Sequence, residues 1–315
     1  MKMRYNASDT VEYDPLPRVK DPPDIISRIL ISPFSYQYMG PGKQGYDSEL
    51  MDKLTKGKEW RLLPKASAGI SLLKDLLEIE EVSIFTTFHT HYVSGCVLEA
   101  FHDAKISRTL SPTTDAILII HEWGIEHPSL NELKKRSIEN DIPIIEDCAL
   151  TMRKDLGNLG DFVLHSFPKL LPMQFGGMLS GRLPDDIDRR FPELISYGRK
   201  RDIILSQLMC HLDSLDTNFA KRITNWKYLD RIFRQAGLHP YFIPGPKDVP
   251  YVYMLGTNKS EELSKILWEF GIEAGVYWKN DGMFLPCHQN LENYQLDYIA
   301  GVVLDKIDRC GENKQ

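Results

Sequence analysis

Two strongly apolar runs, separated by one amphipathic segment, constrain the fold of this chain more than any other feature. AILIIH at 116–121 and IPIIED at 142–147 are apolar at nearly every position until they end in polar residues. HPSLNELKKRSIEND at 127–141 lies between them and places apolar residues at helical spacing. Strands without polar alternation are typical of parallel sheets that are covered on both faces. The pattern therefore predicts a parallel α/β sheet.

The alternation continues on both sides of this unit. The remaining segments with strand or helix patterns are 67–79, 82–85, 92–101, 161–167 and 176–181, and beyond about residue 187 two long helices, two strands and two further helices. We expect a mostly parallel central sheet followed by a smaller α+β part. The predicted organisation is an N-terminal arm at 1–46, a large domain at 47–210 and a small domain at 211–315.

Three predicted strands end on polar residues, namely His121, Asp147 and Ser166. The carboxyl ends of parallel strands share one rim of a sheet, and ligands in such folds bind there. We therefore expect these three side chains to converge on a binding site.

Composition excludes several classes of protein. The formal net charge is −6, which lacks the basic footprint of a nucleic-acid binder. No apolar run approaches the about 20 residues that span a bilayer, and the first residues lack the apolar core of a secretory signal. The five cysteines are widely spaced and form no C-x-x-C pair, so we expect neither a disulfide framework nor a zinc site. This use of cysteine is typical of a reducing compartment, and we expect a cytoplasmic protein. We expect no membrane and no nucleic acid among its partners.

Common cofactor and metal motifs are missing. The sequence contains no G-x-G-x-x-G after a strand, no P-loop and no H-E-x-x-H. His89 and His91 flank one threonine, but an isolated H-x-H is more often a polar loop than a metal site. We expect no metal.

Asp147 and Lys169 are the residues best suited to chemistry. A buried carboxylate such as Asp147 is costly unless it meets a cation or several donors, and a protonated pyridinium is one such cation. A helix N-cap would explain Asp147 equally well. Lys169 lies among apolar neighbours in FPKLLPMQFGGML, which suits Schiff-base chemistry, although most lysines simply reach to solvent. Gly176 and Gly177 allow a close backbone approach nearby.

Taken in order, these motifs resemble the signature of the DegT/DnrJ/EryC1/StrS family of sugar aminotransferases. The matching pieces are Glu146-Asp147-Cys148-Ala149, Gly157-Asn158-Leu159-Gly160-Asp161, Ser166-Phe167, Lys169 and Gly176-Gly177. Similar flanking pieces are LPKASAGISLL at 63–73, Tyr92-Val93-Ser94, RITNWKYLDRIF at 222–233, FGIEAGVYW at 270–278 and the segment 284–303. The resemblance runs from about residue 63 to 305.

The resemblance implies fold type I and the cofactor pyridoxal 5'-phosphate (PLP). Lys169 would hold PLP as a Schiff base and act as general base, and Asp147 would keep the pyridine protonated. The phosphate would bind to Ser67, Ala68 and Ser166 at a helix N-terminus, where we also expect Ser67 as the N-cap.

Tyr92 would stack on the pyridine ring. A core position would also explain this aromatic residue, and Phe88 and His89 are rival stacking residues because the loop before Tyr92 carries extra residues. His121 would either orient Asp147 or face substrate, or it would simply be a strand-end histidine with its own partners.

The implied reaction is ping-pong transamination. An amino acid, glutamate by family analogy, would donate the amino group, and a nucleotide-linked keto sugar would accept it. The resemblance also implies a homodimer, in which the arm at 1–46 and the segment near Arg199 and Arg201 would reach the partner subunit.

Three departures from the family pattern bear on activity. Leu150 stands where the family usually has glutamine, Phe175 stands where an acidic residue commonly precedes the glycines, and Lys169 follows Ser166 about two residues too soon. A non-catalytic homologue would explain these departures. A PLP-dependent sugar dehydratase is a further alternative, but that branch has a histidine in place of the lysine.

Overall fold

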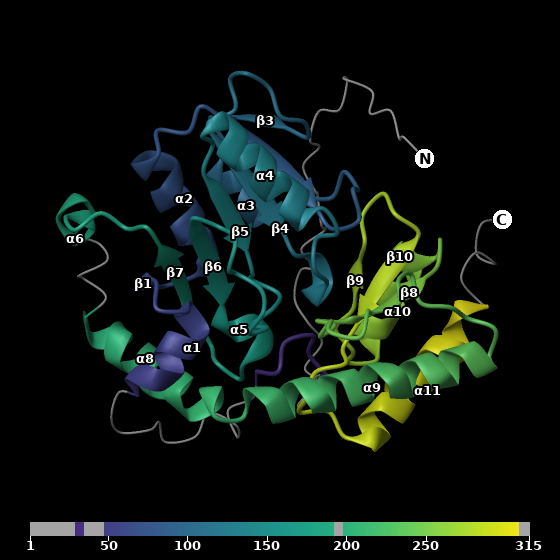
Figure 1. Ribbon diagram of the computed structural model, residues 1–315. Helices are drawn as coiled ribbons and strands as arrows, with labels where there is room; N and C mark the ends of the chain where they lie inside the picture. The colour runs from purple at the N-terminus through teal and green to yellow at the C-terminus, as the bar shows by residue number, and fades with distance from the viewer. Residues whose placement is uncertain (1–28, 35–46, 192–197, 309–315) are drawn as a thin grey trace.

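Two sheets organise the computed structural model, which describes residues 29–34, 47–191 and 198–308 (Figure 1). The larger sheet has seven strands in the order β1-β7-β6-β5-β4-β2-β3. Its strands are β1 (Glu59–Leu63), β2 (Glu81–Thr86), β3 (Lys105–Ser107), β4 (Ala116–Ile120), β5 (Ile144–Asp147), β6 (Phe162–Ser166) and β7 (Gly177–Gly181). The five strands from β3 to β6 in this order are mutually parallel, whereas β7 runs antiparallel to both of its neighbours. The expected mostly parallel sheet is confirmed.

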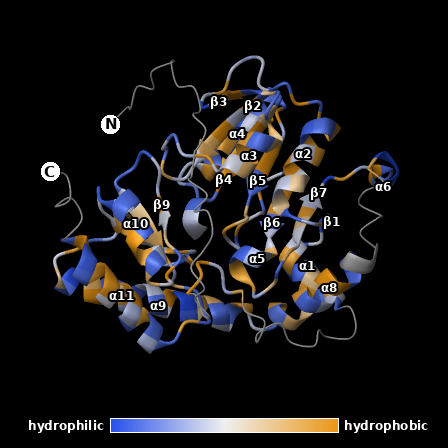
Figure 2. Cartoon of the chain, turned by 180° about the vertical axis from the view of Figure 1, so that it is seen from behind, coloured by the Kyte–Doolittle hydropathy of each residue, from blue (hydrophilic) through white to orange (hydrophobic). Residues whose placement is uncertain are grey.

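Helices cover both faces of this sheet. α2 (Ala66–Leu76) and α3 (Gly95–Ala100) pack on one face, where the strands contribute residues such as Leu118 and Leu164. α4 (Leu130–Asn140) packs on the other face against Ile117, Ile119 and Val163. Because both faces are covered, the central strands are apolar on both sides, as the runs in the sequence indicated. Figure 2 shows the apolar colouring concentrated along these strands.

Strand register aligns the polar strand ends at one rim. Ile120 pairs with Asp147, and Asp147 pairs with Leu164, two residues before the end of β6. The backbone N–H of His121 donates to the carbonyl oxygen of Asp147 over 3.2 Å. His121, Asp147 and Ser166 therefore follow adjacent parallel strands at the same edge of the sheet.

The smaller sheet lies in the C-terminal part of the chain. Its antiparallel order is β8-β10-β9, with β8 (Tyr253–Gly256), β9 (Gly275–Val276) and β10 (Gly282–Leu285). α9 (Leu215–Gln235), α10 (Ser260–Glu269) and α11 (Asn293–Ile307) enclose a separate apolar core with it. We call β8 to β10 with α9 to α11 the C-terminal unit. In Figure 1 the long helix α9 runs from below the larger sheet to α11.

A third apolar cluster joins the two sheets. It combines α1 (Ser48–Thr55), α5 (Phe167–Leu170) and α8 (Gly198–Leu212) with the segment that leads into β8. The short helix η2 (Glu122–Gly124) adds Trp123 to this cluster, while α6 (Ile187–Arg190) packs against the α2 side of the larger sheet. The C-terminal unit is therefore packed against the carboxyl-end rim and the adjoining helices.

Several local predictions need correction or lie outside the described residues. The N-cap of α2 is Lys65, so the expectation of Ser67 as the N-cap was wrong, and α2 begins at Ala66. Most of the expected arm at 1–46 lies outside the described residues, but 29–34 is described, and Ile29 pairs with Ile272 of the C-terminal unit. In the described parts of the chain, no helix combines the length and apolarity that a membrane crossing requires.

Candidate active site

Asp147 is a buried carboxylate at the end of β5 with little compensation. Its side chain is 7% exposed, and Oδ1 accepts a 2.8 Å hydrogen bond from the backbone N–H of Ala149. Burial raises the pKa of Asp147, and the Ala149 N–H and the nearby His121 and Lys169 side chains only partly oppose this rise. The N-cap alternative does not apply, because Ala149 is followed by turn and loop and not by a helix. The site can accept a cation or a strong donor beside Asp147.

Lys169 lies on α5, a single turn that follows β6 directly. Ser166 is the N-cap of this turn, and Pro168 occupies its start. The Lys169 side chain is exposed, so the expected apolar setting applies to its neighbours Phe167 and Leu170 and not to the amine itself. Its charge is close enough to favour the ionised form of Asp147. The shortened connection therefore still brings the lysine to the rim that carries Asp147.

The N-terminus of α2 approaches the ends of β6 and β7 closely. Gly177 pairs with Ser166 on one side and with Leu63 on the other. A Cβ added to Gly177 would come within 2.8 Å of the Ala66 backbone nitrogen, so only glycine allows the two backbones to approach this closely. Ser67 and Ala68 are half-buried in the first turn of the 11-residue α2, and the half-buried Ser166 lies beside this turn. A helix N-terminus favours a dianion, although the Ala68 N–H already donates to the Lys65 carbonyl oxygen over 3.1 Å.

Tyr92 is partly buried in an aromatic cluster ahead of α3. Its ring stacks on Trp123 at 5.9 Å between centroids and meets Tyr277 edge-on at 5.3 Å. The rival stacking residues are engaged elsewhere: Phe88 stacks on Phe242, and His89 has an exposed side chain whose ring lies beside His127. All three rings have aromatic neighbours, so the stacking role of Tyr92 stays a prediction.

His121 holds a structural carboxylate. Its Nδ1 accepts a 3.1 Å hydrogen bond from the His127 backbone N–H, so the proton lies on Nε2 and is donated to Glu146 over 3.2 Å. Glu146 also accepts hydrogen bonds from the backbone N–H groups of Gly157 and Gly160. Burial opposes ionisation of Glu146, but these donors outweigh it and lower its pKa. The imidazole therefore has its own partners and anchors the Gly157–Gly160 turn.

The same cluster is the best metal candidate among the described residues. His121, Glu146 and Cys148 offer ligand atoms within 4.8 Å of one another, and all three are buried. Burial raises the pKa of the Cys148 thiol well above its ordinary value, which opposes the thiolate that a metal needs. The two nearby cations Lys56 and Lys58 act on Glu146 and Cys148 as well, and the Glu146 oxygens are already engaged. We assign this cluster a structural role.

Sequence reasoning missed a second buried carboxyl group at the rim. Glu122 follows His121 and is 3% exposed, with Oε2 accepting from the Phe88 N–H and Oε1 from the Tyr277 hydroxyl. Burial raises the pKa of Glu122 to about 7 against these donors. Trp123 and Gly124 both have positive φ, and a Cβ on Gly124 would meet the Val249 carbonyl oxygen at 2.0 Å. The HEWG sequence after an apolar strand was the available signal for this tight contact.

Two residues that depart from the expected pattern, Leu150 and Phe175, are apolar and also have apolar surroundings. Leu150 and Phe175 are partly buried against the apolar cluster that contains Met152, Phe167 and Leu171. Neither side chain can donate a hydrogen bond to a cofactor oxygen. This part of the rim therefore contributes to the apolar core and offers no hydrogen-bond donor to a ligand.

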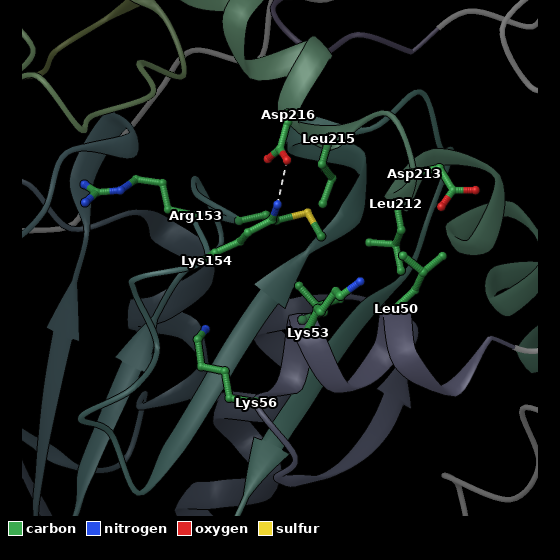
Figure 3. A pocket seen from close by; sticks show the side chains of 11 residues that line it. Leu50, Lys53, Lys56, Arg153, Lys154, Leu212, Asp213, Leu215 and Asp216 are labelled. Atoms are coloured by element: carbon green, nitrogen blue, oxygen red, sulfur yellow. Dashed lines mark hydrogen bonds and ion pairs between the residues drawn. The ribbon is translucent and has the colours of Figure 1, made fainter.

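A separate hollow of about 250 Å³ lies away from these residues. It is bounded by α1, the segment at 152–154 and the turn between α8 and α9 (Figure 3). Its cations are already engaged: Lys154 pairs with Asp216 at 2.6 Å and Lys53 with Glu49 at 2.7 Å. The hollow includes none of the candidate cofactor residues.

Comparison with solved structures identifies the fold. The aminotransferase TlmJ from Streptoalloteichus hindustanus superposes with a TM-score of 0.68 at 18% identity, covering 83% of this chain and 89% of that one. This is the fold of the sugar aminotransferases. A DegT DnrJ EryC1 StrS aminotransferase from Brucella abortus matches with a TM-score of 0.65 at 15% identity, covering 87% and 92% of the two chains.

A third similar structure was solved in the presence of a sugar nucleotide. DesI, solved in the presence of its TDP-sugar product, has a TM-score of 0.66 at 13% identity, with 83% of each chain covered. The sequence matches no family model and no curated protein. Identities this low establish the fold of these aminotransferases for this chain and leave its chemistry to be argued from its own residues.

Proposed function

We propose that this chain is a PLP-dependent aminotransferase that moves an amino group from an amino acid, glutamate in our proposal, to a nucleotide-linked keto sugar. The observation that carries the proposal is that Asp147, at the end of β5, and Lys169, on the turn after β6, lie at the same rim of the sheet, with the N-terminus of α2 beside the end of β6. A buried carboxylate without a full set of donors, an accessible amine and a dianion-binding helix end are the three requirements of this cofactor.

The residues fit PLP at each of its polar ends. Asp147 would face the pyridine nitrogen and keep a proton there, because burial opposes its charge more strongly than its described neighbours support it. The phosphate would lie against Ser67, Ala68 and Ser166 at the N-terminus of α2, which the missing side chain of Gly177 allows to approach β6 closely. Tyr92 would cover one face of the ring and exclude water from it. When bound, PLP supplies an electron sink for the carbon that loses its proton.

Lys169 has two roles in this proposal. Its Nζ would hold the cofactor at rest, and with an amino acid bound in its place the same atom would accept the proton from the amino acid's Cα. The amino acid leaves as a 2-oxo acid, and the keto sugar leaves as an amino sugar. No outside oxidant or reductant is needed, since the two half-reactions balance.

The assembly and location are proposals of the same kind. We propose a cytoplasmic homodimer with a PLP domain at 47–210 and a small domain at 211–315, in keeping with the C₂ symmetry common among oligomers. The described residues support a division near α9, which carries the chain from the larger sheet into the C-terminal unit.

The decisive experiment is absorbance spectroscopy of purified protein with added PLP, before and after glutamate. We expect a visible band that glutamate bleaches, and borohydride reduction followed by peptide mapping should place the cofactor on Lys169. Lys65 is the matched alternative, because it is an exposed lysine at the N-cap of α2. A label on Lys65, or no band, would refute the assignment of Lys169.

A non-catalytic homologue is the second candidate, and one observation favours it. Leu150 and Phe175 are packed in apolar surroundings at places where polar residues are expected beside the cofactor. In that case the protein would take up no PLP, and Lys169→Ala would leave its spectrum and stability unchanged.

A further inference from the structure

Arg222 is a buried cation for which the described residues provide no carboxylate. It lies on α9, is 0% exposed, and donates from Nη1 to the carbonyl oxygen of Tyr251 over 2.7 Å and from Nη2 to Oε1 of Gln289 over 2.8 Å. Its guanidinium also lies 5.7 Å from the centre of the Tyr251 ring. Burial lowers the pKa of Arg222. A buried charge held only by neutral acceptors is costly, and such violations tend to occur at functional sites.

Gln289 connects Arg222 to α5, the turn that carries Lys169, and we call this turn the lysine turn. Its Nε2 donates to the carbonyl oxygen of Leu170 over 2.7 Å, and its side chain is 8% exposed. Because Oε1 accepts from Arg222, the orientation of the Gln289 amide is fixed, and Nε2 must face Leu170. Leu170 directly follows Lys169, so the C-terminal unit holds the carbonyl group beside the candidate catalytic residue.

The lysine turn needs such external support. α5 has only four residues, and the Leu171 N–H donates to the Phe167 carbonyl oxygen at its end over 2.8 Å. An isolated turn of this length is unstable in water because helix nucleation is unfavourable. The connection from Ser166 to Lys169 is also shorter than the resemblance leads one to expect, so the position of the turn determines where the lysine side chain begins.

We propose that Arg222 and Gln289 are positioning residues for Lys169: the guanidinium orients the Gln289 amide, which clamps the Leu170 carbonyl and fixes the turn that carries the amine. The proposal rests on the proposed function in that Lys169 is the residue that reacts. It adds that the C-terminal unit, through α9, sets the position of a lysine that belongs to the larger sheet.

A purely structural role is the competing explanation, and Asn225 offers the matched control. Asn225 lies one turn further along α9, is 1% exposed, and donates from Nδ2 to the His288 carbonyl oxygen over 2.7 Å. It makes the same kind of contact to the neighbouring residue of the same segment without touching α5. Gln289→Glu and Asn225→Asp each remove one buried amide donor, and Glu at 289 still accepts from Arg222.

The first measurement is hydrogen exchange of the cofactor-free proteins. We expect the Leu171 amide to exchange about tenfold faster in Gln289→Glu, because a buried hydrogen bond is lost, and to be unchanged in Asn225→Asp. Gln289→Glu also gives Arg222 a carboxylate partner, so thermal unfolding should show a smaller loss of stability in this variant than in Asn225→Asp. Unchanged exchange at Leu171 in Gln289→Glu would overturn the clamp.

The second measurement is competitive labelling of lysines with acetic anhydride, read by mass spectrometry relative to the exposed Lys135. In Gln289→Glu we expect the labelling rate of Lys169 to rise about threefold, because the turn that carries the amine is no longer held through the Leu170 carbonyl and opens more often. Asn225→Asp should leave that rate unchanged. Equal labelling of Lys169 in all three proteins would show that the clamp is structural only and would overturn the positioning role.

These readouts separate the two proposals. If the wild-type protein traps no PLP on Lys169, the proposed function fails, while exchange and labelling still decide whether Arg222 and Gln289 position that residue. If PLP is trapped, Gln289→Glu should lower the affinity for PLP by about tenfold relative to Asn225→Asp. An equal affinity in the two variants would contradict the inference.

Discussion

The hydroxyl of Tyr277 donates a 3.1 Å hydrogen bond to the buried carboxyl of Glu122 and thereby joins the two sheets of the molecule. Glu122 follows β4 of the larger sheet, whereas Tyr277 follows β9 of the smaller one. The Thr90 hydroxyl lies 2.9 Å from the same phenol, so the contact also includes the loop ahead of Tyr92. Burial raises the pKa of the Tyr277 phenol, which keeps it protonated as a donor.

Stability should fall as the pH rises through the pKa of Glu122. In the folded protein this pKa is about 7, against 4.5 ordinarily, so the folded state holds a proton that the unfolded state has lost. The proton on Glu122 contributes its full stabilisation to the folded state below pH 4.5. This stabilisation, roughly 3 kcal/mol of unfolding free energy, is lost by about pH 7. Urea unfolding of wild type and Glu122→Gln at pH 5 and 8 should show this loss in wild type only. The exposed Glu139→Gln is the control, and a parallel pH dependence in both Glu122 forms would contradict the assignment.

Stability should also fall in acid because His165 is buried in its neutral form. Burial, followed by the charge of Lys56, lowers the pKa of His165 from 6.5 to about 3. The unfolded chain therefore binds a proton below pH 6.5 that the folded chain does not, and stability is lost as the pH falls toward 3. His165→Leu should reduce the loss between pH 7 and 4 by about 3 kcal/mol, as measured by urea unfolding. The exposed His102→Gln should leave the loss as it is in wild type.

The sequence predicted the elements whose pattern is local and missed those that depend on distant contacts. β4, β5 and α4 were predictable because each buries a periodic or continuous apolar face. β1 and β10 were not, because Glu59–Leu63 and Gly282–Leu285 become strands only by pairing with β7 and with β8 and β9.

The residues of the candidate site also fall into those that a local pattern predicts and those that depend on distant contacts. Strand ends revealed Asp147 and Ser166, because their place in the sheet follows from the order of elements. The contacts of Glu122 with Tyr277 and of Gln289 with Leu170 span 155 and 119 residues, and no local pattern indicates them. The exposure of Lys169 also could not be predicted, since apolar neighbours in sequence do not determine which way a side chain points on a single turn.

Asp147→Asn should separate stability from cofactor chemistry. Burial raises the pKa of Asp147, so its charge destabilises the cofactor-free fold, and a neutral amide of the same size should raise the midpoint of thermal unfolding. The Ala149 contact can persist, because the asparagine oxygen still accepts. The rate of the glutamate half-reaction, followed by loss of the visible band, should fall at least about hundredfold. Asp75→Asn on the exposed side of α2 should change neither property, and an unaffected half-reaction in Asp147→Asn would exclude Asp147 as the partner of the pyridine nitrogen.

Gly177→Ala should both destabilise the protein and weaken binding at the proposed phosphate site. The added Cβ would come within 2.8 Å of both the Ala66 nitrogen and the His165 carbonyl oxygen, which are backbone atoms of α2 and β6 and cannot move independently. We expect a loss of about 2 kcal/mol in unfolding free energy and at least about tenfold weaker binding of PLP or of free phosphate. Gly301→Ala on α11 is the matched control, since nothing lies within 4 Å of its added Cβ and alanine favours the helix by about 0.5 to 1 kcal/mol. Equal phosphate binding in the two variants would show that the end of α2 is not the anion site, whereas a loss in Gly177→Ala alone would locate the site between Ala66 and Ser166.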